Sequence, residues 1–120
     1  MVFLQKRGID ALNSPDYFGL FGGHAEEGEN PEQTLKREIK EELDFDLEKF
    51  EYFRKYEYDD MIMDIFFMAV PDNFEEKITV NEGQYGKWLT EQEFLSEEKT
   101  IKHDKSELID LFKYIKEKYE

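Results

Sequence analysis

Residues 61–70 limit the possible fold more than any other part of the sequence. They are apolar at odd and even positions alike, and Asp64 is their one charged member. A strand can bury both of its faces only inside a sheet that is covered on both sides. We therefore expect a central strand here, preceded by a strand at residues 50–58 and a turn at Asp59 and Asp60.

The remaining pattern predicts shorter elements on both sides of this pair. Further strands are expected at residues 2–6, 78–80 and 85–89. Thr90 should cap a short helical segment through Phe94, and a last helix is expected over residues 105–118. The sequence thus predicts a single α+β domain over residues 1–120, with a mixed sheet and a few helices packed on it.

Charge and cysteine content exclude several classes of protein. The chain has 30 acidic and 16 basic residues, a formal net charge of −14, which would repel the backbone of a nucleic acid polymer. It has no cysteine, so disulfides and thiolate zinc sites are excluded and a reducing compartment is favoured. Without an apolar run of membrane length, we expect no membrane partner and a cytoplasmic location.

Residues 30–44 have the pattern of a capped amphipathic helix. Asn30 and Gln33 form a capping-box pattern, and Pro31 suits the first turn. Apolar residues recur at every fourth position as a buried stripe: Leu35, Ile39 and Leu43. We expect the helix to end near Asp44.

Three glutamates share one side of this helix. Glu38, Glu41 and Glu42 stand at positions i, i+3 and i+4. Like charges at this spacing repel each other by roughly a few tenths of a kcal/mol, and a bound divalent cation would reverse that repulsion. Carboxylate oxygens in this number are typical ligands of Mg²⁺ or Mn²⁺ rather than zinc. By themselves the same residues are also compatible with a solvated helix face.

The order of residues around the helix resembles the Nudix box of the MutT/Nudix hydrolases. From Gly23, five residues lead to Glu29 and seven more to Arg37, and then follow Glu38, Ile39, Lys40, Glu41, Glu42 and Leu43. The match runs from Gly23 to Phe45 and departs from the family pattern at Asp44, where the family has glycine. That position favours a left-handed backbone, which aspartate tolerates at a cost of about 1 kcal/mol.

The resemblance implies a Nudix-type α/β/α sandwich and a diphosphate hydrolase that depends on Mg²⁺, with Mn²⁺ as the alternative. Its metal ligands would be oxygens of the loop and helix: the Gly23 carbonyl and the carboxylates of Glu38, Glu41 and Glu42. Glu29 and Arg37 would form an ion pair that orients these carboxylates. The residues that the resemblance assigns to catalysis are Glu41, Glu38, Arg37 and Glu29.

A second stretch, residues 82–88, resembles the segment of the MutT branch in which a loop glutamate reaches the metal. Glu82 is thereby implied as a fourth carboxylate. The general base that accepts a proton from water would be Glu41 or Glu82, and we favour Glu41.

The implied reaction is hydrolysis of a nucleoside diphosphate that is linked to another group. A nucleoside triphosphate, with oxidised dGTP among the candidates, would give a monophosphate and pyrophosphate. ADP-ribose, a dinucleotide or a nucleotide sugar is an alternative substrate. A non-catalytic module that binds a nucleotide is a further alternative, although the intact glutamates of the box weigh against it.

The substrate pocket is predicted with less detail. In the MutT branch an aromatic wall on the central strand and a polar residue near the last helix hold the purine, which here points to Leu20, Phe67 and His103 or Asp104. Asp64 could accept a hydrogen bond from a base amino group or take part in an ion pair at the strand end. Family members usually begin with one more strand before the equivalent of residues 2–6. Its absence would expose a sheet edge, which favours a homodimer.

Overall fold

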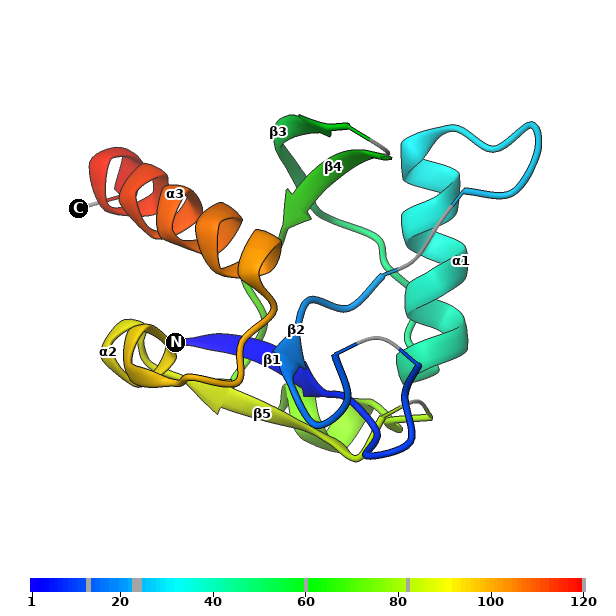
Figure 1. Ribbon diagram of the computed structural model, residues 1–120. Helices are drawn as coiled ribbons and strands as arrows, with labels where there is room; N and C mark the ends of the chain where they lie inside the picture. The colour runs from blue at the N-terminus through cyan, green and yellow to red at the C-terminus, as the bar shows by residue number, and fades with distance from the viewer. Residues whose placement is uncertain (13, 23–24, 60, 82, 120) are drawn as a thin grey trace. The chain divides into compact units, whose positions relative to one another are not determined.

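The computed structural model describes residues 1–12, 14–22, 25–59, 61–81 and 83–119. Their contacts group into two compact units, and each unit is described by itself. The first comprises Met1–Phe21 with Val80–Glu120, and the second comprises Gly22–Thr79. The described residues form antiparallel strands together with helices (Figure 1), which confirms the predicted α+β class.

The first unit contains an antiparallel sheet with the strand order β2-β1-β5 among the described residues. The central strand β1 (Val2–Lys6) pairs on one side with β2 (Phe18–Gly19) and on the other with β5 (Tyr85–Leu89). An isolated parallel bridge joins Phe18 to Thr100. The predicted strands at residues 2–6 and 85–89 are confirmed.

An aromatic cluster packs around Phe3 of β1. The Phe3 ring is stacked on Phe21 with centroids 5.6 Å apart and lies 5.1 Å from the ring of Trp88. The backbone of Gly86 lies directly against the Phe3 ring, so that a Cβ at position 86 would collide with it. Glycine therefore lets the ring cross β5 at close range.

Two helices follow β5 in this unit. Thr90 caps α2 (Glu91–Ser96) by a reciprocal capping box with Glu93, which confirms the predicted cap. Helix α3 (Lys102–Tyr119) begins earlier than predicted, because the Lys105 N–H already donates to the Ile101 carbonyl at 2.9 Å. No helix among the described residues is long and apolar enough to cross a membrane.

The apolar core of the first unit combines strand and helix residues. Its buried members are Leu4, Phe18, Leu89, Phe94, Leu108 and Leu111. The α2 helix contacts both β5 and α3, and the rings of Phe94 and Phe112 lie 6.0 Å apart. Burial of these side chains provides the main stabilisation of the unit.

Asp16 connects three separate segments of the first unit. Its carboxylate accepts a hydrogen bond from Gln84 Nε2 at 2.7 Å and pairs with Lys99 Nζ at 3.0 Å and Lys6 Nζ at 3.5 Å. The Gln84 side chain also donates to the Arg7 carbonyl at 2.8 Å. The hydrogen bond from Gln84, followed by the one from Lys99, lowers the pKa of Asp16 to about 2.

The second unit begins with α1 (Pro31–Leu43), whose predicted caps are confirmed. Asn30 and Gln33 form the capping box with hydrogen bonds of 2.8 and 2.9 Å. The C-cap residue Asp44 has φ 50° and ψ 43°, and its N–H donates to the Lys40 carbonyl at 3.0 Å. Aspartate therefore adopts the left-handed conformation that the sequence predicts for this position.

Apolar residues from three segments of the second unit are buried. They are Ile39 and Leu43 of α1, Ile65, and Phe74 of the 3₁₀ helix η1 (Phe74–Lys77). The Phe45 ring contacts Phe74 edge to face, with centroids 5.2 Å apart. The predicted strand at residues 78–80 is wrong, because no strand forms there and the Thr79 N–H donates to the Leu43 carbonyl at 2.9 Å.

A hairpin of β3 (Glu51–Tyr58) and β4 (Met61–Phe67) completes the second unit. The predicted central strand is wrong in its position and its length. Among the described residues β4 pairs with β3 alone, and it ends at Phe67. The Phe66 ring is instead covered edge to face by the rings of Phe50 and Tyr52. Ile65 is buried but Ile62 is 63% exposed, so the expected burial of both faces of this strand is wrong as well.

Replacing Asp44 by glycine should raise the free energy of unfolding by about 0.5–1 kcal/mol, because glycine adopts a positive φ at no steric cost. The lost ion pair between Lys40 and Asp44 joins two exposed side chains and offsets little of this gain. Urea denaturation followed by circular dichroism measures the change. Asp44→Ala, the matched control, should lower the free energy by about 1 kcal/mol. A glycine variant less stable than the wild type would contradict the prediction.

The stabilisation by Asp16 should depend on pH in a defined window. Because folding lowers its pKa from 3.8 to about 2, its contribution is present above pH 4 and is lost as the pH falls toward 2. Thermal unfolding of the wild type and of Asp16→Asn between pH 2 and pH 5 tests this. The stability difference between them should shrink as the pH falls, and Asp72→Asn, which removes another exposed carboxylate, is the control for the change in net charge. An equal difference at every pH would refute it.

Candidate active site

The acids of the Nudix box differ widely in exposure on α1. The side chain of Glu41 is 52% exposed and that of Glu38 is 15% exposed. Glu42 is only 2% exposed, although a solvated position was compatible with its sequence context. Helical spacing fixes the side of the helix on which these residues lie, but the burial of Glu42 was not evident from that spacing.

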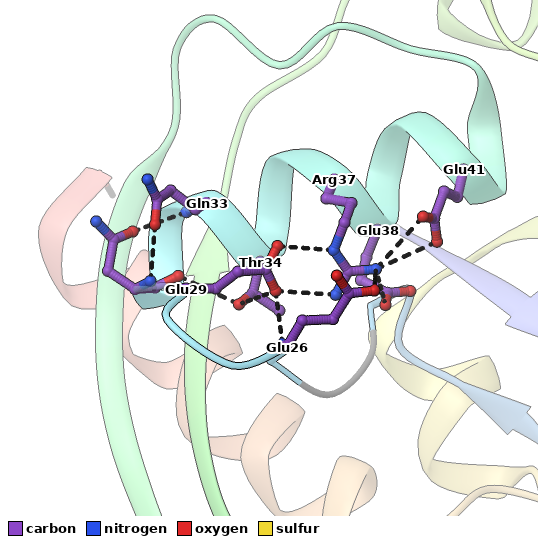
Figure 2. Close-up of polar contacts among 8 residues, drawn as sticks. Glu26, Glu29, Gln33, Thr34, Arg37, Glu38 and Glu41 are labelled. Carbon is purple, nitrogen blue, oxygen red and sulfur yellow. Dashed lines mark hydrogen bonds and ion pairs between the residues drawn. The ribbon is translucent and has the colours of Figure 1, made fainter.

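An ion pair joins the loop before α1 to the second turn of the helix. Arg37 Nε donates to Glu29 Oε2 at 2.7 Å, and Nη2 donates to Glu29 Oε1 at 3.0 Å. Figure 2 shows this two-point contact between the guanidinium and the carboxylate. Such bidentate pairs are among the stronger polar contacts in proteins. The structure thus brings together Glu29 and Arg37, as the sequence predicts.

Backbone and hydroxyl groups reinforce the position of Glu29. Its carboxylate also accepts from the Glu26 N–H at 2.7 Å and from the Thr34 hydroxyl at 3.2 Å. The Arg37 hydrogen bond, followed by that of the Glu26 N–H, lowers the pKa of Glu29 to about 2. Glu29 therefore stays ionised at any pH at which the protein would work.

The third nitrogen of Arg37 faces the box glutamates. Nη1 donates to Glu38 Oε1 at 2.8 Å and lies 3.3 and 3.4 Å from the two carboxylate oxygens of Glu41. Its distance to Glu26 Oε1 is 3.6 Å. Figure 2 shows the carboxylates of Glu38 and Glu41 directed at Nη1. One positive group therefore contacts two of the predicted metal ligands.

Glu42 is directed to a different partner. Its Oε1 accepts a hydrogen bond from the Gly22 N–H at 2.7 Å, next to the glycine that begins the box. A buried carboxylate requires such a donor, because leaving it without one would cost free energy. Glu42 thus fixes the loop at Gly22 to the last turn of α1.

The donor set can be compared with the requirements of a divalent cation. Glu38 and Glu41 both contact the guanidinium of Arg37. Their carboxylate oxygens are of the kind that Mg²⁺ prefers as ligands. Among the described residues no group of three or more acidic or histidine side chains is arranged to hold a metal. The predicted ligands Gly23 and Glu82 lie outside the described residues. Glu38 and Glu41 thus face one cationic side chain, and the role of the whole set in metal binding stays a prediction.

The predicted substrate residues are distributed over both units. Phe67 and Asp64 belong to β4 of the second unit, and Asp64 Oδ1 accepts a hydrogen bond from the Tyr52 hydroxyl at 2.8 Å. Leu20 and His103 belong to the first unit. Their roles in binding a base stay predictions.

Three polar contacts of the predicted site residues were not anticipated from the sequence. The Thr34 hydroxyl donates to Glu29 and the Tyr52 hydroxyl donates to Asp64. The Leu20 N–H donates to the Asp104 carboxylate at 3.0 Å. Burial raises the pKa of Asp104, an effect partly offset by the Leu20 hydrogen bond. Thr34 lies one turn after Asn30, a position at which a hydroxyl can reach back to the loop. The other two contacts join residues distant in sequence and carry no local signal.

Solved structures similar to this chain support the fold. The MutT protein from Methanosarcina mazei Go1 has a TM-score of 0.66 at 17% identity, over 92% of this chain and 83% of that protein. A structure from a study of MutT from Aliivibrio salmonicida and Vibrio cholerae has a TM-score of 0.64 at 24% identity. The likeness covers 78% of this chain and 71% of that chain. At these identities the likeness shows the fold alone.

Two curated relatives are similar in sequence. The 8-oxo-dGTP diphosphatase of Escherichia coli (strain K12) is 33% identical over 91 residues, which cover 74% of this chain and 69% of that enzyme. The 8-oxo-dGTP diphosphatase of Haemophilus influenzae is 39% identical over 71 residues, 57% of this chain and 51% of that enzyme. The matched segment thus spans about half of the second relative's length.

The model of the NUDIX domain matches residues 1–112, nearly the whole chain. That match includes the complete box, the whole second unit and the first unit up to residue 112. With the box geometry on α1 and the relatives in agreement, this chain belongs to the NUDIX domain family.

Proposed function

We propose that this protein is a pyrophosphohydrolase that converts a nucleoside triphosphate to a monophosphate and pyrophosphate with the help of a divalent metal ion. Membership of the NUDIX family gives the reaction class, a hydrolase acting on phosphorus-containing anhydrides. The observation that carries the proposal is the convergence of Glu38 and Glu41 on the single cationic nitrogen of Arg37. Two carboxylates that face one positive group are close enough to bind the same metal ion once that group is displaced.

The chemistry of the donors suits Mg²⁺, with Mn²⁺ as the alternative. Glu38 and Glu41 would hold the ion, and the other proposed ligands are Glu42, the Gly23 carbonyl and Glu82. When bound, the ion would neutralise charge on the diphosphate and lower the pKa of a nearby water. The relatives and the family support a divalent metal in general, and this ligand set is our proposal.

Glu41 is the proposed general base. It is the most exposed of the box glutamates on α1, so its carboxylate is accessible to water. Glu41 would accept a proton as the water oxygen bonds to phosphorus and the bond from phosphorus to the leaving phosphate oxygen breaks. Glu82 is the alternative base.

Glu29 and Arg37 act on the reaction through the other glutamates. Because Glu29 fixes two nitrogens of Arg37, the third nitrogen has a defined position beside Glu38 and Glu41. A positioned carboxylate loses less conformational freedom when it engages the substrate complex. We therefore assign Glu29 and Arg37 as positioning residues.

Oxidised dGTP is the first substrate candidate, since both curated relatives are named 8-oxo-dGTP diphosphatase. Leu20, Phe67 and His103 are the proposed contacts of the base. Asp64 can contact a base amino group only by sharing or releasing its hydrogen bond with Tyr52. ADP-ribose, dinucleotides and nucleotide sugars are the competing substrates to be compared.

The test is hydrolysis by the purified protein with Mg²⁺ and a panel of nucleoside triphosphates, including 8-oxo-dGTP, together with ADP-ribose, diadenosine polyphosphates and nucleotide sugars. Chromatography would quantify the released monophosphate and pyrophosphate. We expect turnover of a triphosphate, and Glu41→Gln should lower kcat about a hundredfold or more, as expected for loss of a general base.

Glu32→Gln is the matched control, because it makes the same change at an exposed position in the first turn of the same helix. Its turnover should stay within about twofold of the wild type. Equal losses in the two variants would show that Glu41 acts only through helix charge. Absence of turnover for every compound would refute the hydrolase proposal.

A further inference from the structure

The guanidinium of Arg37 is divided between two sets of acids. Nε and Nη2 hold Glu29 in the loop, and Nη1 holds Glu38 and Glu41 on the helix. The Arg37 side chain is only 22% exposed, and those of Glu29 and Glu38 are 17% and 15% exposed. These charges are therefore screened less by water than an ordinary surface ion pair would be.

The Nη1 contacts use oxygens that a metal would also need. Carboxylate oxygens that accept charge-assisted hydrogen bonds from a guanidinium have part of their negative charge already compensated. A cation that approaches the same oxygens is repelled by the positive charge of Arg37. The guanidinium cannot remove this repulsion by releasing a proton, because it stays protonated in proteins.

We infer that Arg37 is the internal counter-ion of Glu38 and Glu41 in the metal-free protein, and that a divalent cation binds by displacing its Nη1 group from them. This inference rests on the metal site of the proposed function. Glu29 keeps its contacts to Nε and Nη2 during the exchange, so the arginine stays attached to the loop and only its Nη1 partners change. Arg37 thereby stabilises the helix without metal and lowers its affinity for metal.

The bidentate contact to Glu29 makes such a limited change feasible. It has two hydrogen bonds of 2.7 and 3.0 Å, whereas the Glu41 contacts of Nη1 are longer, at 3.3 and 3.4 Å. Glu41 is also the most exposed of the three acids. Its contact to Nη1 is therefore weaker than that of Glu38 and should be exchanged before it.

The test compares Mn²⁺ affinity, measured by electron paramagnetic resonance of the free ion, in the wild type, Arg37→Gln and Lys40→Gln. Both substitutions remove one positive charge from α1, but Lys40 Nζ pairs with Asp44 and Asp46, which are not proposed ligands. Arg37→Gln should bind Mn²⁺ on the order of tenfold more tightly than either other protein, because the competing charge-assisted contacts are gone. Affinity equal to that of Lys40→Gln, or weaker than the wild type, would overturn the inference.

A second measurement uses the unmodified sequence and does not depend on the folding of a variant. The side-chain nitrogen resonances of Arg37 would be followed by NMR as Mg²⁺ is added. The Nε–H resonance should keep its position, while the Nη1 resonance should shift and its protons should exchange faster with water. An Nη1 resonance unchanged at saturating Mg²⁺ would also overturn the inference. Failure of the wild type to bind Mn²⁺ at all would instead refute the metal site itself.

Discussion

The ion pair between Glu29 and Arg37 is the contact on which the arrangement of the site depends. It joins a loop residue to a helix residue eight positions later by two hydrogen bonds. The Asn30 capping box defines where α1 begins, and Arg37 lies in the second turn after it. The guanidinium group is planar and rigid. Two of its nitrogens are held by Glu29, and this fixes the position of the third nitrogen, which contacts Glu38 and Glu41.

Local sequence patterns predicted the parts of the fold that local physics determines. The caps at Asn30 and Thr90 and the left-handed conformation of Asp44 depend on residues within one or two turns of each other. The local pattern also marked residues 2–6 and 85–89 as strands, but it did not specify that they pair. The predictions that failed concern which residues pack against each other over long distances in the sequence. An apolar pattern predicts burial of β4 but cannot specify what covers each side chain. Aromatic rings contact Phe66, and Ile65 is buried, whereas Ile62 is 63% exposed.

The candidate site was also predicted only in part from the sequence. The resemblance to the Nudix box implied the pair of Glu29 and Arg37, which the structure confirms. Helical spacing predicted that Glu38, Glu41 and Glu42 lie near one another on α1. It could not give the direction of each carboxylate, since rotamers respond to contacts that are distant in sequence, such as the Gly22 N–H that holds Glu42. The homodimer and the cytoplasmic location expected from the sequence stay predictions.

The packing of Trp88 against Phe3 also gives the protein a built-in optical reporter. Trp88 is the only tryptophan of the chain, and it lies in the first unit. The second unit carries Tyr52, Tyr56 and Tyr58 on β3 but no tryptophan. Indole fluorescence would therefore report on the sheet that contains β1 and β5 and not on the helix that carries the box. Comparing it with a signal from α1 would show whether the two units lose their structure in one cooperative step or separately.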